Sequence, residues 1–315
     1  MLAFVGGRLL QAIPVVFLTS IFVFVFIRLV PGDPAVTLAG QRATPEQVAA
    51  LRHNFGLDQP MVVQYVTWIE KLATGDFGTS YVTNRPVSQL IMQRVPATAH
   101  LAVGALLVML LFGVPLGIFT AVRPAHPLGR VVALLTSIAL ATPTFWLGIL
   151  LVLFFAVDLH WLPASGFASI TSDPLGSMKL LILPSLTLGT YGTAVLIRFL
   201  RSSILEVAHA DFVRTANAKG LTERLVVGRH ILRIALLPVV TMLAIQFGYL
   251  LGGAVITEAI FGWPGLGGLI LDAINNQDYL IVQTTMLLLV QIFIVVNVLA
   301  DVCYAVLDPR IRYAG

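Results

Sequence analysis

The basic side chains of this chain gather in residues 198–238, a stretch that lies between long apolar segments. Of the 19 lysines and arginines in the 315 residues, seven fall here: Arg198, Arg201, Arg214, Lys219, Arg224, Arg229 and Arg233. Apolar residues recur at helical spacing through the same stretch, from Leu205 through Ala208 and Phe212 to Ala216. An amphipathic helix with charged residues around its apolar stripe is typical of a surface that docks into a groove of another protein. The alternative interpretation is a solvated basic loop.

Helix signals divide this basic loop, residues 198–233, into two parts. Residues 203–218 favour a helix that stops at Gly220, with Lys219 in its last turn. Thr222 suits the cap of a second helix that runs toward Pro238. The sequence therefore predicts a helix, a turn and a helix, exposed beside a membrane.

Polar residues within the apolar segments are candidates to line a path for a solute, because such groups usually face a bundle interior or an aqueous cavity. These candidates are Thr142, Thr144, Thr190, Tyr191, Gln246 and Tyr249. Hydrogen bonding between neighbouring helices is the alternative for all of them. Pro143, Pro184 and Pro238 can interrupt the helices in which they lie.

A further group of candidates lies in the glycine-rich segment 252–279. Its Gly-Trp-Pro-Gly sequence at 262–265 forces a turn, and its glycines allow close backbone approach. We expect a tight, acidic turn at the outer mouth of the protein. The residues of this turn that would face a partner are Glu258, Trp263, Gly265 and Asp272.

Motifs for catalysis and for metal binding are missing from the sequence. There is no GxxxxGK(S/T) phosphate-binding loop and no HExxH motif, and the six histidines are scattered. The one cysteine, Cys303, allows neither an intrachain disulfide nor a cysteine-based metal site. We therefore predict a protein that is not an enzyme and that binds no metal or cofactor itself.

Composition places these residues in an all-α polytopic membrane protein. The chain is 58% hydrophobic and 11% charged, whereas soluble domains carry about 25% charged residues. Apolar stretches long enough to cross a bilayer as helices occur six times, at 9–30, 97–122, 131–157, 180–200, 234–257 and 280–307. The expected parts are an N-terminal span (1–30), an extracytoplasmic helical region (31–96), a five-helix membrane domain (97–307) and a tail (308–315).

The basic residues of the short loops indicate the orientation. Arg123 and Arg130, the basic loop, and Arg310 with Arg312 all belong on the cytoplasmic side, which places both termini there. This topology explains the net charge of +4, so nucleic acid is not expected as a partner.

The long loop 31–96 has helix signals of its own. Thr44, Pro45 and Gln47 form a capping box with proline in the first turn, and Gly56 is a stop. A second amphipathic helix follows Pro60 and ends at Gly75. These helices are expected to pack on the spans, and contact with an outside partner is the alternative.

Short motifs in order along the chain resemble the membrane permease subunits of the dipeptide, oligopeptide, nickel and glutathione group of ABC importers. The matching segments are 29–34 (LVPGDP), 55–60 (FGLDQP), 75–78 (GDFG), 161–163 (WLP), 183–189 (LPSLTLG), 211–216 (DFVRTA), 218–221 (AKGL), 261–267 (FGWPGLG) and 308–312 (DPRIR). The resemblance covers essentially the whole chain, and it implies the type I importer permease fold in a bacterial inner membrane.

The resemblance implies that the basic loop is the EAA loop, whose short coupling helix docks on an ATPase. The residues carried over to this role are Asp211, Phe212, Arg214, Thr215, Ala216, Lys219 and Gly220. Two departures from the general pattern are Arg-Thr-Ala in place of Glu-Ala-Ala, and the later position of Leu237 and Pro238. Both resemble the peptide branch and leave the docking role intact.

The implied machine contains a paralogous permease subunit, two ABC ATPase subunits that carry ATP and Mg²⁺, and an extracytoplasmic solute-binding protein that faces the turn at 258–272. Short peptides are the expected substrate, with glutathione or a nickel chelate as alternatives. A secondary carrier would need ion-coupling acids within the membrane, but Asp301 is the only acid inside an expected span, and Glu258 adjoins one.

Overall fold

The computed structural model describes residues 2–29, 32–40 and 43–307, which fold into two compact helical units. Unit 1 comprises residues 99–263 with 2–6 and 295–307, and unit 2 comprises Gly7–Thr98 and Pro264–Ile294. The motif at 308–312, the tail and residues 30–31 of the first motif lie outside the described residues.

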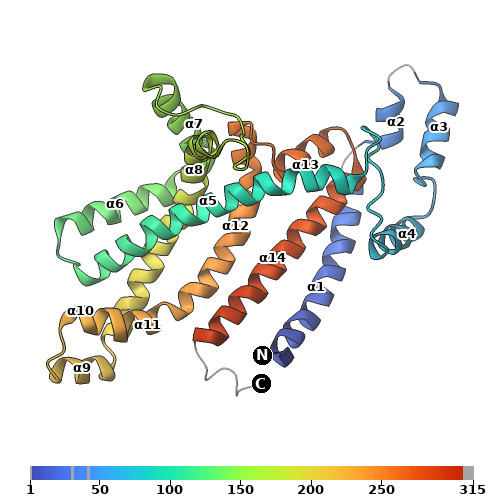
Figure 1. Cartoon of the computed structure of the whole chain (residues 1–315). Helices are drawn as coiled ribbons and strands as arrows, with labels where there is room; N and C mark the ends of the chain where they lie inside the picture. The colour runs from blue at the N-terminus through green and yellow to red at the C-terminus, as the bar shows by residue number, and fades with distance from the viewer. Residues whose placement is uncertain (1, 30–31, 41–42, 308–315) are drawn as a thin grey trace. The chain divides into compact units, whose positions relative to one another are not determined.

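Helices account for almost all of the regular structure (Figure 1). Unit 1 holds α6 (Pro127–Ala141), α7 (Thr144–Leu151), the π-helix η1 (Val152–Asp158), α8 (Pro174–Ala208), α9 (Asp211–Ala218), α10 (Glu223–Leu225), the π-helix η2 (Val226–Ile231), α11 (Leu232–Ala235) and α12 (Leu237–Phe261). Unit 2 holds α2 (Pro34–Ala39), α3 (Pro45–Asn54), α4 (Met61–Ala73) and α13 (Leu266–Asn275). Residues of α1 (Leu2–Leu29), α5 (Val87–Val122) and α14 (Tyr279–Leu307) belong to both units.

The described helices include the expected membrane spans. Five of them are long and apolar enough to cross a bilayer, namely α1 from Gly6 onward, α5, α8, α12 and α14 up to Cys303. A sixth span results if the bent pair Pro127–Ala141 and Thr144–Asp158 is taken as one. The predicted six-span, all-helical architecture is therefore confirmed.

The third span is broken at Pro143, one of the three prolines that were expected to interrupt helices. The chain bends by 110° between α6 and the helix that begins at Thr144. Pro143 has no amide hydrogen for the helix, and it excludes helical geometry at Thr142, whose backbone is extended (φ −85°, ψ 124°). The Thr142 hydroxyl donates to the Ile138 carbonyl at 2.8 Å and so closes the last turn of α6.

In unit 2, residues 32–40 and 43–86 form a lobe of short helices beside α1, here called the α2–α4 lobe. Its predicted capping box is present: Thr44 caps α3, and the Gln47 side chain accepts from the Thr44 amide at 3.0 Å. Helix α4 follows Pro60 as expected and lies on α1, where the Tyr65 and Ser20 hydroxyls are 2.8 Å apart. Helix α4 thus packs on a span, which was the expected arrangement.

Aromatic and charged contacts fix α4 on α1. The Trp68 and Phe24 rings stack with centroids 5.8 Å apart, and Trp68 is buried. One nitrogen of Arg28 donates to the Gln64 side chain at 2.9 Å, while the guanidinium lies 3.4 Å from the centroid of the Phe24 ring. Side-chain contacts, and not the chain connection alone, therefore hold the lobe against α1.

Candidate functional site

The basic loop begins within α8, whose last part is formed by residues 198–208, and it continues through α9, α10 and η2 into α11 in unit 1. Helices α9 and α10 lie beyond the C-terminal end of α8 (Figure 1). The expected helix over 203–218 is wrong in its continuity, because α8 ends at Ala208 and α9 begins at Asp211. Ala210 has extended geometry (φ −69°, ψ 149°), and Nδ1 of His209 lies 2.7 Å from the Leu205 carbonyl oxygen. This break turns α9 away from the axis of α8.

The inner side of α9 is part of the core of unit 1. Val213 is 4% exposed and Ala216 6% exposed. They belong to a cluster of buried residues contributed by five other helices: Met109 and Ala121 of α5, Leu196, Leu200 and Ile204 of α8, Val226 and Ile231 of η2, Ala235 of α11, and Val239 and Met242 of α12. Because α9 shares one close-packed core with three spans, a displacement of α9 must be felt by α5, α8 and α12.

The outer side of α9 carries most of the predicted coupling residues. Asp211, Phe212, Arg214 and Thr215 are all exposed, and Lys219 and Gly220 are exposed directly after the helix. Arg214 pairs with Asp211 at 3.8 Å, a surface contact on the helix itself. Ala216 differs from the other six, because its side chain lies in the core.

The turn after α9 has the geometry that glycine supplies. Gly220 adopts φ +75°, and its amide donates to the Asn217 carbonyl at 2.9 Å, so the predicted helix stop is confirmed. Thr222 occupies the position before α10, although its side chain makes no capping bond. Ser203 then ties the returning chain to α8, since its hydroxyl donates to the Ala235 carbonyl at 2.9 Å in a buried position.

The predicted pathway residues all lie in unit 1 and differ in exposure. Tyr191 of α8 and Tyr249 of α12 are exposed, whereas Gln246 is 5% exposed between packed helices. Thr142 and Thr144 flank the bend at Pro143. The Thr190 hydroxyl donates to the Leu186 carbonyl at 2.6 Å and is thereby satisfied within its own helix. Their role in a pathway stays a prediction.

The glycine-rich turn is more buried than its sequence indicates. Glu258 is 1% exposed and Trp263 is 3% exposed, and the Trp263 ring meets Phe167 edge-on at 5.0 Å. Gly262 ends α12 with φ +58°, and Gly265 precedes α13. Of the four residues expected to face a partner, only Asp272 is exposed.

The sequence matches two profiles that describe one type of membrane protein. Residues 113–313 match the binding-protein-dependent transport system inner membrane component, and residues 1–102 match the N-terminal part of the same component. The chain belongs to this family. It is a multi-pass permease subunit of the inner membrane, as the resemblance in its short motifs implied.

Full-length relatives of this permease occur in several bacteria. It is 44% identical over 313 residues to the glutathione transport system permease protein GsiC of Salmonella typhi, covering 99% of this chain and 100% of that protein. It is 39% identical over 333 residues to the dipeptide transport system permease protein DppB of Alkalihalophilus pseudofirmus, with 99% and 100% covered.

A solved structure shows the fold of this permease. An inward-facing conformation of the MetNI methionine ABC transporter matches with a TM-score of 0.57 at 19% identity, over 70% of this chain and 97% of that chain. The type I ABC importer permease fold is therefore confirmed.

Proposed function

We propose that this permease forms half of the translocation pathway of an ATP-driven importer of short peptides, with α9 as the helix on which an ATPase subunit docks. The other parts would be a paralogous permease subunit, two ABC ATPase subunits that hold ATP and Mg²⁺, and an extracytoplasmic solute-binding protein. In this arrangement α9 and both chain termini face the cytoplasm, following the basic residues of the short loops.

The position of α9 is the observation that supports this proposal best. An ATPase that closes on ATP can push on the exposed residues around Arg214, while Val213 and Ala216 sit in the core shared with α5, α8 and α12. The push would then reach the spans as a shift of packed helices and exchange inward-open for outward-open states. ATP binding and hydrolysis would supply the free energy for this exchange, and the different fit of the open and closed ATPase pair to the two permease states would couple that energy to the spans.

Short peptides are the substrate class that the relatives support. The two relatives named above transport glutathione and dipeptides, and both substrates are short peptides with free carboxylates. We infer that peptides of this size, glutathione among them, pass through this subunit. Selection among them would take place on the solute-binding protein.

The composition of the complex can be tested by purification. Tagged chain, extracted from its own host in mild detergent, should bring along a second six-span permease, P-loop ATPases and a solute-binding protein, identified by mass spectrometry. The recovered complex in proteoliposomes should hydrolyse ATP faster when the binding protein and a dipeptide are added. Recovery of the chain alone, from a preparation in which other membrane complexes survive, would contradict the proposal.

The docking assignment has a specific test in Arg214→Glu. Reversing a charge at the centre of a docking surface is expected to lower peptide-stimulated ATP hydrolysis by at least about tenfold, since arginine anchors often carry interface energy. Arg224→Glu makes the same charge change in the same loop, on α10. Membrane insertion of both variants should equal wild type, and equal losses in both would point to overall charge and not to α9.

A further inference from the structure

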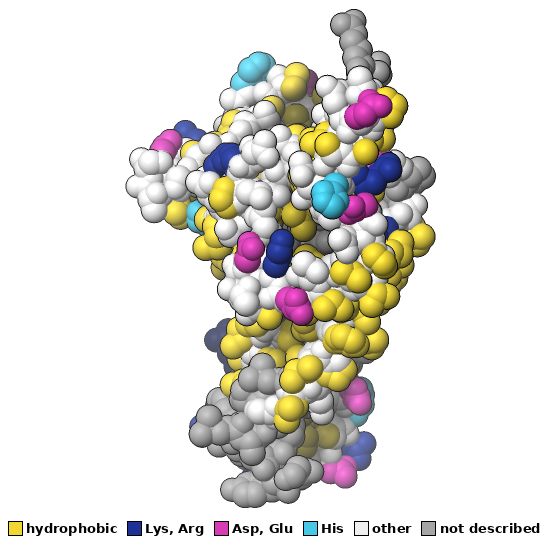
Figure 2. All heavy atoms as spheres, turned by 90° about the vertical axis from the view of Figure 1, so that its right-hand side faces the viewer, with side chains coloured by type: hydrophobic (Ala, Val, Ile, Leu, Met, Phe, Trp, Pro, Cys, Tyr) yellow, Lys and Arg dark blue, Asp and Glu magenta, His cyan; other side chains and the backbone are white. Residues whose placement is uncertain are grey.

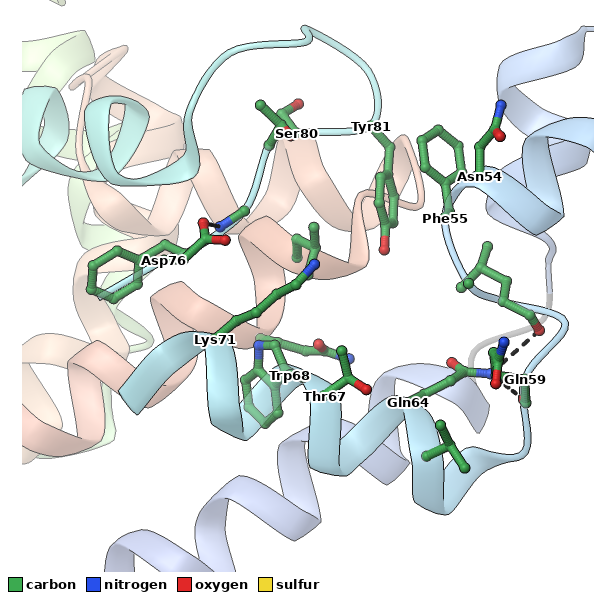
Figure 3. Close-up of a pocket in the computed structure, with 18 of the residues that line it drawn as sticks. Asn54, Phe55, Gln59, Gln64, Thr67, Trp68, Lys71, Asp76, Ser80 and Tyr81 are labelled. Carbon is green, nitrogen blue, oxygen red and sulfur yellow. Dashed lines mark hydrogen bonds between the residues drawn. The ribbon is translucent and has the colours of Figure 1, made fainter. Parts of the chain in front are cut away.

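A cavity of about 690 Å³ lies within unit 2, between the α2–α4 lobe and the ends of α1 and α14 (Figure 3). Its walls come from the end of α1 (Arg28), the turn after α3, helix α4, the loop 76–86 and the start of α14 (Gln283). A volume of this size is typical of sites that hold small molecules, which range over about 300–1,000 Å³. Neither the membrane pathway nor the docking helix uses any of these residues.

Two buried hydrogen-bond donors of this cavity have no acceptor within the described residues. They are Nε1 of Trp68 and Nε2 of Gln283, on side chains that are 6% and 1% exposed. Figure 3 shows the indole nitrogen of Trp68 on the cavity side of α4. Leaving a buried donor unsatisfied is costly, so buried polar groups are nearly always bonded to protein, water or ligand. The two donors are therefore available to an acceptor, from water or from a ligand, that enters the cavity.

Positive charge adds to these donors. The side chain of Lys71 extends from α4 into the cavity, and Arg28 forms part of the wall (Figure 3). Asp76 also lines the cavity, and one oxygen of its carboxylate accepts the Gly78 amide at 2.9 Å. His53, another lining residue, is paired with Asp58 at 2.7 Å. Arg28 is bonded to the Phe24 carbonyl and to Gln64, so the Lys71 ammonium and the two unsatisfied donors are the groups that favour an anionic acceptor such as a carboxylate.

The opposite wall is aromatic. The Phe55 and Tyr81 rings lie 4.3 Å apart, and the Tyr81 hydroxyl points into the cavity (Figure 3). Burial raises the pKa of Tyr81 to about 12, so this hydroxyl keeps its proton and can donate at neutral pH. Side-chain amides of Asn54 and Gln59 also line the cavity and suit a ligand with amide groups.

We propose that this cavity is a binding site for a small carboxylate, and that its ligand is a short peptide held by its C-terminal carboxylate near Lys71, Trp68 and Gln283. The carboxylate follows from the donors and cations, and the peptide body follows from the aromatic wall, the amides and the volume. That the peptide is also a substrate rests on the proposed function. Figure 2 shows one face of the molecule, on which hydrophobic side chains and charged side chains of both signs are exposed.

The test compares two forms of one ligand on the purified full chain in nanodiscs, by isothermal titration calorimetry. Alanyl-phenylalanine should bind, and the same dipeptide with an amidated C-terminus should bind about tenfold or more weakly, because a charge-assisted hydrogen bond is lost. Lys71→Met should weaken binding of the free acid by a similar factor. Lys179→Met removes an exposed lysine from α8, outside this cavity, and should leave binding unchanged.

A second variant guards against loss of the fold. Gln283→Leu replaces an unpartnered buried amide by an apolar group of similar size, so the protein should fold as well as wild type or better. This variant should still weaken binding of the free dipeptide. Equal binding of the free and amidated dipeptides, or unchanged binding in both Lys71→Met and Gln283→Leu, would overturn the site.

Two further results separate the ligand classes and the two proposals. If inorganic phosphate, or the phosphatidylglycerol lipid of a nanodisc, competes with the dipeptide for Lys71, the site binds phosphate groups and the peptide assignment is wrong. If the assembled transporter imports alanyl-phenylalanine while the chain shows no Lys71-dependent binding, the cavity proposal fails and the proposed function stands. If the chain binds the dipeptide through Lys71 and the assembled transporter does not import it, the proposed function fails and the cavity proposal stands.

Discussion

Helices α9 and α4 are two short amphipathic helices that lie against spans, and they differ in what they leave free. Helix α9 buries Val213 and Ala216 in a solid core and turns its charged residues outward. Helix α4 buries Trp68 beside a cavity and turns Lys71 into it. A closely packed inner face with a charged outer face suits a macromolecular partner. An inner face that borders a cavity and carries unsatisfied donors suits a small ligand.

The largest expected effect tests whether the inner face of α9 is closely packed against the core of unit 1. Val213→Asp would place an unpaired carboxylate in the cluster shared with α8 and α12, at a cost of about 4 kcal/mol. We expect trypsin to cleave the basic loop much faster in this variant, because local opening exposes Arg214 and Lys219. Asn217→Asp adds the same charge to an exposed position of α9 and should leave the cleavage rate unchanged. Equal cleavage rates in both variants would show that the inner face of α9 is not packed in the core.

The next effect concerns the α2–α4 lobe. Trp68→Ala should destabilise the lobe by about 3 kcal/mol, near the lower end for a buried aromatic residue, because one side of the indole already borders a cavity. Hydrogen exchange of the α4 amides should accelerate, while α9 amides should exchange as in wild type. Val63→Ala, at an exposed position of the same helix, serves as the control. Faster exchange in both helices would contradict the separation of the two regions.

A matched pair of glycines sharpens the comparison further. Gly220 after α9 (φ +75°) and Gly56 after α3 (φ +66°) are both left-handed, and an added Cβ would meet no neighbour at either position. Alanine at each should cost about 1 kcal/mol through backbone strain alone. Both variants should lose thermal stability to a similar extent, measured on the purified chain. Only Gly220→Ala should also lower the ATP hydrolysis of the assembled complex measured without peptide, and a matching loss in Gly56→Ala would remove the functional distinction.

The smallest effect is the pH response of the α2–α4 lobe. The hydrogen bond with Asp58 raises the pKa of His53 above 6.5, and the bond with His53 lowers the pKa of Asp58 below 3.8. The stabilisation from His53 is complete below pH 6.5 and is lost as the pH rises through the raised pKa. The part from Asp58 is complete above pH 3.8 and is lost as the pH falls through the lowered pKa. Wild type should therefore exceed His53→Gln in thermal midpoint at pH 6, and the difference should fade by pH 8.

Much of the fold follows from local sequence signals. The capping box at Thr44, the proline before α4 and the left-handed Gly220 act within a few residues of themselves, and each appears where it was predicted. The bend at Pro143 shows the limit of hydropathy, because a proline interrupts a helix without interrupting its apolar run. The helix break at His209 and Ala210 contains neither glycine nor proline, so no local signal predicts it. It depends on the core of unit 1, in which α9 packs.

The candidate sites were predictable to different degrees. The coupling residues form one contiguous segment, so sequence reasoning found them together, although the inward direction of Ala216 required the structure. The cavity could not be found in this way, because it joins Arg28, the α4 helix, the loop 76–86 and Gln283 across more than half of the chain. Burial of Glu258 and Trp263 was likewise hidden by an apparently exposed, glycine-rich turn.

Docking of an ATPase on the exposed side of α9 is the central claim, and a crosslink from Thr215 tests it most directly. Cys303 is the only native cysteine, so Cys303→Ser with Thr215→Cys gives a single reactive thiol on α9. After labelling with benzophenone maleimide and irradiation of the intact complex, mass spectrometry should identify an adduct with a P-loop ATPase. The same label at Glu70→Cys on α4 should give no such adduct. A fully labelled Thr215→Cys complex that retains its ATPase and yields no adduct would contradict the account.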